Sequence, residues 1–145
     1  MLRGCELIAF AKKQDERGVL VALEGESHEV PFSIERVYYI SSVPSNCRRG
    51  FHAHKDLEQV LVCACGSVSI LVDDGYSQDT IVLSGCDKGL YIGPMVWREM
   101  FSFTEGAVLV VLASKHYDAA DYLSDYNEFK RLVVGAAAEE KEGRE

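Results

Sequence analysis

Residues 58–75 read EQVLVCACGSVSILVDDG and contain two apolar runs separated by Gly66. The second run ends in Asp73-Asp74-Gly75, a strong signal for a hairpin turn. Runs of this length that are rich in valine and isoleucine are typical of β-strands. The stretch therefore predicts two consecutive strands, each closed by a tight turn.

Similar short runs recur along most of the chain. Turn residues separate them every ~8–12 residues, which is typical of a β-sandwich or barrel and not of alternating strands and helices. We expect strands over residues 6–10, 19–23, 34–40, 50–54, 58–65, 67–72, 80–83, 89–92, 96–101 and 107–113. The pattern predicts an all-β fold with antiparallel strands.

Only the C-terminal part has a helical pattern. Tyr122, Tyr126 and Phe129 recur at helical spacing between residues 118 and 131. Residues 132–145 are mostly small or charged, and we predict that they form a disordered tail. The expected organisation is thus a single domain over residues 1–131 that ends in a short helix.

The composition is that of a folded soluble protein. The 145 residues are 48% hydrophobic and 26% charged, which suits one domain with a proper core. With a net charge of −8 and no basic stretch longer than Arg48-Arg49, a nucleic-acid partner is not expected. No apolar run is long enough for a signal peptide or a membrane span, and the five cysteines lack a disulfide framework. We therefore expect a cytoplasmic protein with free thiols and no membrane partner.

Candidate chemistry is concentrated in Arg49-Gly50-Phe51-His52-Ala53-His54. Because side chains alternate between the faces of a strand, His52 and His54 should point the same way. Two imidazoles on one face either bind a metal or transfer protons.

A metal site needs a further ligand that the sequence does not supply. The spacing His52-x-His54-x3-Glu58 resembles the first half of the cupin metal motif, which normally takes another histidine soon after a Gly-Pro turn. That turn is Gly93-Pro94, but Trp97 and Arg98 follow it, and neither side chain binds metals. We therefore predict no metal and no other cofactor, and favour proton transfer by the histidines.

The residues around the histidines also resemble a known family. The segment Arg49-Gly50-Phe51-His52-Ala53-His54-Lys55, followed by Leu57-Glu58-Gln59, is similar to the signature of the sugar-nucleotide 3,4-ketoisomerases, small cupins that act on dTDP-4-keto-6-deoxyglucose. Matching segments follow in the same order at residues 34–40, 89–100, 111–114 and 117–129. The resemblance implies a cupin jelly-roll antiparallel β-barrel with a short C-terminal helix.

The resemblance also implies a function. A base would remove the proton at C3 of the 4-keto sugar, an enediolate would form, and protonation at C4 would leave the ketone at C3. The 3-keto product would serve the biosynthesis of 3-amino-3,6-dideoxy sugars, such as those of lipopolysaccharide O-antigen. The family further implies metal independence and a homodimer, in which we expect the first strand to contact the partner subunit.

Each candidate residue receives an expected role. His52 is the candidate base, and His54 would relay or return the proton. Arg17, Arg98 or the hydroxyl of Tyr38 would stabilise the oxyanion. The candidate substrate-binding residues are Arg36, Arg49, Gln59 and Trp97, although Trp97 has packing as its alternative role.

Two other functions stay open. A dTDP-sugar 3,5-epimerase shares the Arg-Gly-x-His motif but usually lacks a histidine at position 54. A cupin without catalytic activity would bind the sugar nucleotide and leave it unchanged. For the ketoisomerase, the combination of Arg17 and Arg98 favours a gluco over a galacto configuration at C4, because arginine does not give up its proton at neutral pH.

Overall fold

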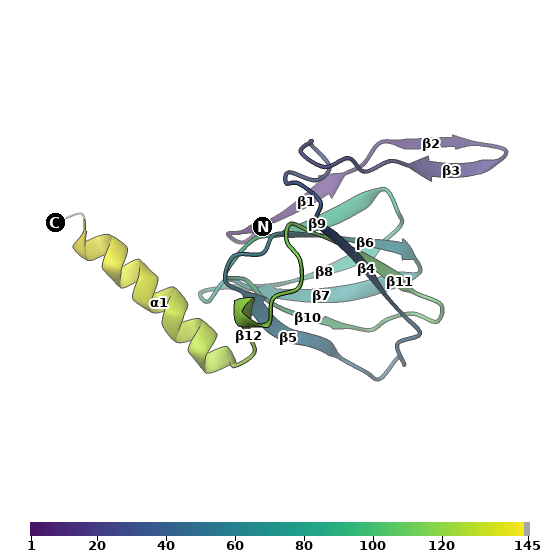
Figure 1. The fold of residues 1–145 in the computed structure, drawn as a ribbon. Helices are drawn as coiled ribbons and strands as arrows, with labels where there is room; N and C mark the ends of the chain where they lie inside the picture. Colours follow the sequence, from purple (N-terminus) through teal and green to yellow (C-terminus); the bar gives the residue numbers. More distant parts are fainter. Residues whose placement is uncertain (144–145) are drawn as a thin grey trace.

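Two five-stranded antiparallel sheets face each other in the computed structural model, which describes residues 1–143 (Figure 1). In spatial order, the first sheet consists of β1 (Cys5–Ala9), β9 (Lys88–Ile92), β6 (Gln59–Cys65), β11 (Val108–Ala113) and β4 (Arg36–Ser41). The second consists of β12 (Tyr122–Leu123), β5 (Arg49–His54), β10 (Trp97–Phe101), β7 (Ser67–Asp73) and β8 (Gln78–Ser84). This antiparallel jelly roll, with one α-helix at its C-terminal end, confirms the predicted fold class.

The main core lies between the two sheets. Leu61 of β6 and its neighbours Leu109 and Val111 of β11 point inward from the first sheet. Ile70 of β7 and Met100 of β10 meet them from the second sheet. Because side chains alternate along a strand, every second residue of these runs is buried here. Residues 58–75 thus supply one central strand to each sheet.

The outer face of each sheet is covered by a different segment. Phe32, in the loop before β4, packs against Val60 on the outer side of the first sheet. The first turns of helix α1 (Tyr126–Glu142) pack on the outer side of the second sheet, where Phe129 lies against Trp97, and the rest of the helix projects away from the body (Figure 1). Residues 1–143 therefore form three apolar clusters, one between the sheets and one on the outer side of each.

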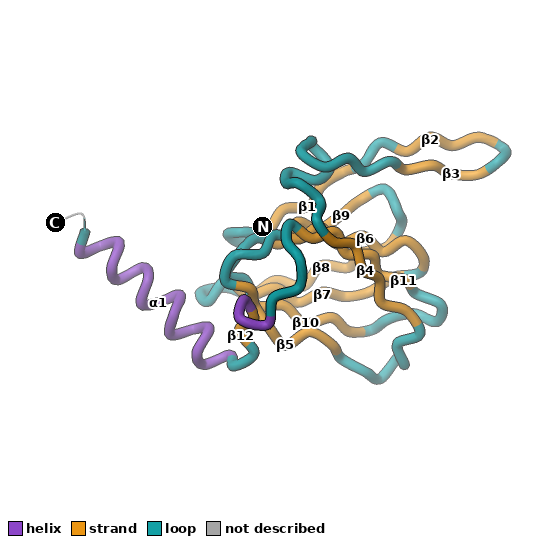
Figure 2. Tube along the Cα trace, in the orientation of Figure 1, coloured by secondary structure: helices purple, strands orange, loops and turns teal. Residues whose placement is uncertain are grey.

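A two-stranded hairpin projects from this body (Figures 1 and 2). It consists of β2 (Lys12–Asp15) and β3 (Gly18–Val21), which pair only with each other. The sequence predicts β3 but not β2, because the residues of β2 are polar, exposed and without apolar alternation. Val19 and Leu20 on β3 are exposed apolar side chains.

The C-terminal helix begins and ends later than predicted. Residues 119–121 form a short 3-10 helix, η1 (Ala119–Asp121), and β12 follows before α1 begins. Asp125 caps α1 by accepting hydrogen bonds from the backbone N–H groups of Asn127 and Glu128, which explains its start. The helix continues to Glu142, so residues 132–142 are not the predicted disordered tail; their alanines and glutamates favour helix. Residues 144 and 145 of that predicted tail lie outside the described residues.

Among residues 1–143, no helix combines the length and the apolar character needed to span a membrane.

Candidate active site

Strand β5 presents two histidines to the space between the sheets. Ala53 is buried against the α1 side, so His52 and His54 on either side of it point inward. Their ring centroids lie 4.9 Å apart. His54 is fully buried and His52 is partly accessible. The structure thus brings together the two histidines that the sequence singles out.

A bulge in β5 brings His52 next to strand β10. Arg98 pairs with His52 and Glu99 pairs with Gly50, which leaves Phe51 as the extra residue. Gly50 and Phe51 have positive φ angles of 94° and 60°. A Cβ atom on Gly50 would lie 2.8 Å from the carbonyl oxygen of Arg98, so glycine is required there. The positive φ of Phe51 places backbone strain beside the candidate site, where such strain often occurs.

The guanidinium of Arg98 lies buried at the same end of the core, with only 1% of the residue exposed. It donates hydrogen bonds to Oε1 of Gln59 at 2.5 Å and to the carbonyl oxygen of Val96 at 3.0 Å. Burial lowers the pKa of Arg98 to about 10, so the group keeps its charge at neutral pH. A fixed positive charge is therefore built into the wall of the site.

The hydroxyl of Tyr38 is the second fixed donor. Gln59 links it to Arg98, because Nε2 of Gln59 donates to the Tyr38 oxygen at 3.1 Å. Since that oxygen accepts this bond, the hydroxyl proton can be donated to another acceptor. Burial raises the pKa of Tyr38, so the proton is retained at neutral pH. Tyr38, Gln59 and Arg98 thus form one connected network.

Asp121 and Tyr122 complete the site, and neither is among the predicted site residues. Oδ2 of Asp121 lies 3.0 Å from Nδ1 of His54, and Oδ1 accepts a hydrogen bond from the backbone N–H of Asp56 at 2.8 Å. The ring of Tyr122 lies 4.5 Å from that of His54 and 5.0 Å from that of His52, centroid to centroid. Both residues lie in the segment predicted to be helical, and a contact across 67 positions leaves no local signal in the sequence.

The surroundings keep both imidazoles neutral. Burial, followed by the positive charge of Arg98, lowers the pKa of His52 to about 4. Burial is also the largest cause for His54, whose pKa falls to about 2, with Arg98, His52 and Arg36 adding to the effect. A carboxylate favours the charged form of an imidazole, so Asp121, at 3.0 Å from Nδ1 of His54, opposes this fall. A neutral imidazole can accept a proton, as a general base must.

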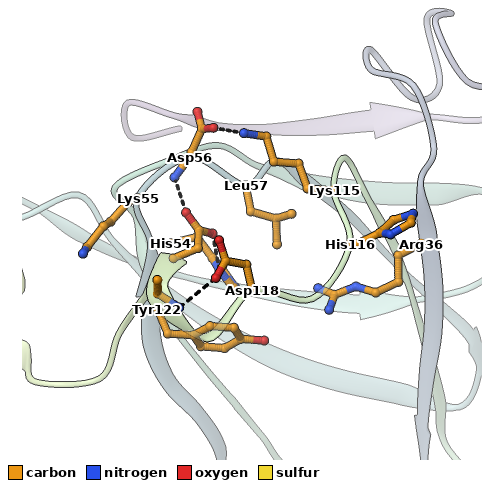
Figure 3. A pocket seen from close by; sticks show the side chains of 11 residues that line it. Arg36, His54, Lys55, Asp56, Leu57, Lys115, His116, Asp118 and Tyr122 are labelled. Atoms are coloured by element: carbon orange, nitrogen blue, oxygen red, sulfur yellow. Dashed lines mark hydrogen bonds and ion pairs between the residues drawn. The ribbon is translucent and has the colours of Figure 1, made fainter.

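A cavity of about 200 Å³ opens beside His54 (Figure 3). Arg36 and Tyr122 face this cavity together with His54, from three different strands. The Arg36 guanidinium lies 5.3 Å from the ring centroid of Tyr38 and 5.9 Å from that of Tyr117. Its buried Nε has no hydrogen-bond partner among residues 1–143. A guanidinium held in this way is suited to bind a phosphate or carboxylate oxygen.

The structure contradicts the prediction that Trp97 binds substrate. Trp97 precedes Arg98 on β10 and therefore points to the opposite, outer face of the sheet. It packs against Tyr126 and Phe129 of α1, and its Nε1 donates to Glu99 at 2.9 Å. Its role is to attach the helix to the sheet, which was the alternative for this residue.

Two of the predicted arginines are exposed on the surface. Arg17 is in the turn of the β2–β3 hairpin, with 85% of its side chain exposed, and forms an ion pair with Asp15 at 2.6 Å. Arg49 is exposed at the first position of β5, opposite Met100. Within this chain, the structure does not bring Arg17 to the candidate site.

Glu58, the carboxylate of the expected cupin motif, is turned away from the histidines. Its Oε1 accepts a hydrogen bond from the hydroxyl of Tyr91 at 2.7 Å, and Tyr91 packs with the outer cluster of the first sheet. In the part of the chain that the structure describes, no three His, Cys, Asp or Glu side chains lie close enough to share a metal ion.

Comparison with known proteins identifies relatives over nearly the whole chain. Residues 3–134 match the family model described as "FdtA: WxcM-like, C-terminal". A protein of Aneurinibacillus thermoaerophilus named TDP-4-oxo-6-deoxy-alpha-D-glucose-3,4-oxoisomerase is 49% identical over 138 residues, which are 95% of this chain and 98% of that protein.

Solved structures give the same result. QdtA, a sugar 3,4-ketoisomerase from Thermoanaerobacterium thermosaccharolyticum solved with TDP, has a TM-score of 0.91 and 46% identity, covering 94% of this chain and 98% of its own. WlaRB, a TDP-quinovose 3,4-ketoisomerase from Campylobacter jejuni, has a TM-score of 0.86 and 48% identity. The match covers 90% of this chain and 99% of WlaRB. The chain therefore belongs to the FdtA family of WxcM-like C-terminal domains.

Proposed function

We propose that this protein is a sugar-nucleotide 3,4-ketoisomerase that converts TDP-4-keto-6-deoxyglucose into a TDP-3-keto-6-deoxyhexose. The observation that carries the proposal is the pair of neutral, inward-facing histidines beside two fixed hydrogen-bond donors, Tyr38 and Arg98. This is what proton transfer next to a ketone requires: a base, a second proton carrier and a stabilised oxyanion. The names of the relatives support the same reaction.

The reaction moves one hydrogen from C3 to C4. His52 takes the C3 proton, and the electron pair of that bond forms the double bond of an enediolate while the C4 carbonyl oxygen becomes an oxyanion. Protonation at C4 then leaves the ketone at C3, as the O3 proton is lost and O4 gains one. His52 suits the first step because it is the more accessible of the two histidines and is neutral at pH 7. His54, whose ring is 4.9 Å away, is the candidate for returning the proton.

Tyr38 and Arg98 are the proposed donors to the developing oxyanion. The Tyr38 hydroxyl has a free proton because its oxygen accepts from Gln59. Arg98 cannot reorient easily, because Gln59 and the Val96 carbonyl both accept from it. Donors that are fixed before the reaction stabilise charge without reorganisation. Arg36, facing the cavity beside His54, is the proposed partner of a phosphate oxygen.

We further propose a product with the gluco configuration at C4. Arg98 keeps its proton at neutral pH and so orients the substrate without protonating C4. The 48% identity with WlaRB, named for a quinovose, which is a 6-deoxyglucose, supports this assignment. A 3-keto-6-deoxyglucose is the kind of compound that an aminotransferase converts to a 3-amino-3,6-dideoxy sugar, as found in O-antigens. The Arg98→His variant should yield some galacto product.

We also propose that the protein needs no metal, forms a homodimer and is cytoplasmic. The charge of Arg98 beside both imidazoles would repel a divalent cation at that position. Strand β1 is an edge strand, and the projecting β2–β3 hairpin exposes Val19 and Leu20, so a second copy would cover both. Elemental analysis, chelation and light scattering test these points. A stoichiometric metal needed for activity, or a monomer at micromolar concentration, would contradict them.

Incubation with TDP-4-keto-6-deoxyglucose in deuterated water tests the function itself. A ketoisomerase should release a 3-keto sugar that carries some deuterium at C4. Deuterium at C3 and C5 of a 4-keto product would instead identify a 3,5-epimerase, and binding without any label would identify a sugar-nucleotide-binding protein without activity.

A further inference from the structure

Asp121 has two partners that together fix its orientation. Its Oδ1 accepts from the backbone N–H of Asp56 at 2.8 Å, and its Oδ2 lies 3.0 Å from Nδ1 of His54. The backbone of Asp121 is tied to the same strand end, because its carbonyl accepts from the N–H of Lys55. The carboxylate is therefore held against His54 by contacts that do not involve the histidine.

This arrangement selects one tautomer of His54. An ionised carboxylate only accepts hydrogen bonds, so Nδ1 of His54 must carry the ring proton. Nε2 is then the basic nitrogen, and it is buried without a hydrogen-bond partner among residues 1–143. The rings of His52 and Tyr122 lie 4.9 Å and 4.5 Å from the same imidazole, centroid to centroid. A lone pair is thus available where the substrate would react.

We propose that Asp121 is a positioning residue that holds His54 in the Nδ1-protonated tautomer, with Nε2 as the atom that carries a proton during the reaction. This role rests on the proposed function. Nε2 accepts the proton that His52 has taken from C3 and delivers it to C4, so both histidines return to their neutral forms. While the proton is on Nε2, the Asp121 carboxylate stabilises the imidazolium against the cations around it.

The charged and titratable groups that face His54 make this assistance necessary. Arg98 comes from β10, Arg36 from β4 and His52 from β5, and the first two are cations. Tyr122 adds a neutral hydroxyl from β12. Asp121 is the anion that contacts the ring. Without its charge, no ion pair among residues 1–143 would stabilise an imidazolium at His54.

The Asp121→Asn variant gives a sharp prediction. The backbone N–H of Asp56 needs an acceptor, so it should bind the amide oxygen, and the amide NH₂ would then face Nδ1 of His54. An NH₂ group donates, so the His54 proton should move to Nε2 and block its lone pair. Two-bond ¹H–¹⁵N spectra of the ligand-free protein distinguish the tautomers. We expect Nδ1–H in the wild type and Nε2–H in Asp121→Asn.

Turnover should fall by about 10²-fold or more in Asp121→Asn, the usual effect of losing one general acid–base group. Washout of the C3 hydrogen should be less affected, since His52 performs that step. In a His54→Asn background, Asp121→Asn should cause almost no additional loss, because both changes remove the same function. The matched control is Asp118→Asn. Asp118 lines the same cavity but caps η1 through the N–H of Ala120, and asparagine caps equally well.

Three results would overturn the proposal. One is an Nε2-protonated His54 in the wild-type protein, which requires no variant and so does not depend on how the variant folds. The second is an Asp121→Asn variant with unchanged tautomer and turnover. The third is a full additional loss of turnover in the His54→Asn background, which would indicate a structural role. If the wild-type protein had no ketoisomerase activity, the proposed function would fail, and the spectra would still report the tautomer.

Discussion

The two ends of the space between the sheets are built from the same strands but have opposite character. At one end, Tyr38, Gln59 and Arg98 point inward, and Gln59 is hydrogen-bonded to both of the others. Two residues further along β4, β6 and β10, the inward positions hold the apolar side chains of Ile40, Leu61 and Met100.

The apolar end serves the stability of the fold, and the polar end serves the proposed catalysis. Apolar side chains stabilise the fold by about 1.5–3 kcal/mol each when fully buried. A buried cation and a buried amide bring no such gain and must be hydrogen-bonded to be tolerated at all. Arg98 donates to two acceptors, Gln59 and the Val96 carbonyl, while its buried Nε has no partner among residues 1–143. The polar end is therefore retained for its chemistry, and the apolar end holds the sheets together.

The largest effect is expected for His52→Asn at the polar end. Removal of the base should lower turnover by about 10²–10⁴-fold and abolish exchange of the C3 hydrogen with solvent. Thermal unfolding should change little, since the ring is partly accessible. Exchange at the wild-type rate, measured by NMR in deuterated water, would show that His54 is the base instead.

Arg98→Met makes the polar end resemble the apolar one. The guanidinium lowers the pKa of both histidines, so its loss should raise both values and move the acid limb of the kcat/KM profile to higher pH. The variant also leaves Oε1 of Gln59 and the Val96 carbonyl without their donor, at a cost of about 1–3 kcal/mol each. A pH profile with an unchanged acid limb would contradict the role of Arg98. Gln59→Leu in the Arg98→Met background should recover part of the stability.

Leu61→Ala tests whether the apolar end contributes to stability and not to turnover. The cavity left between the sheets should lower the free energy of unfolding by about 2–5 kcal/mol. Turnover per folded molecule should stay at the wild-type level, because Leu61 belongs to the apolar core and supplies no polar group to the proposed reaction. Denaturant unfolding and steady-state rates measured on the same sample separate the two effects. A large loss of turnover with normal stability would remove the distinction between the two ends.

Acid should destabilise the protein because the buried histidines of the polar end resist protonation in the folded state. The folded-state pKa of His52 is about 4 against an ordinary value of 6.5, so stability is complete above pH 6.5 and is lost as the pH falls toward 4. The unfolded chain binds a proton in this range that the folded chain does not. The difference between the folded-state and ordinary pKa of His52 corresponds to about 3 kcal/mol in the free energy of unfolding. His54 contributes with the same sign. Unfolding curves between pH 7 and pH 4 should show a smaller loss for His52→Asn.

The smallest effect on catalysis is expected outside both ends, at Trp97. Trp97→Leu removes the contacts with Tyr126 and Phe129, so α1 should be attached less firmly and become more open to protease. KM for the sugar nucleotide should not change, because the ring is on the outer face of the sheet. An increase in KM with a normally protected helix would restore the substrate-binding role that the structure contradicts.

Much of this molecule follows from local patterns. The apolar runs and turn residues predict the central strands of both sheets, and the spacing of His52 and His54 predicts that they share a face. These features depend on neighbours in the sequence and on the period of two in a strand, which are the same in any fold. The family resemblance of residues 49–59 adds the reaction that we propose for them.

Other features depend on which strands become neighbours. Asp121 and Tyr122 reach His54 because β12 pairs with the end of β5, a pairing that overrides the helical spacing around Tyr122. Trp97 and Arg98 are adjacent in the sequence, but packing of α1 on one face and the core on the other assigns them opposite roles. Arg17 is carried away from the histidines on a hairpin that pairs only with itself. Such contacts join residues far apart in the chain, and their energies depend on the assembled sheets, so no short stretch of sequence contains them.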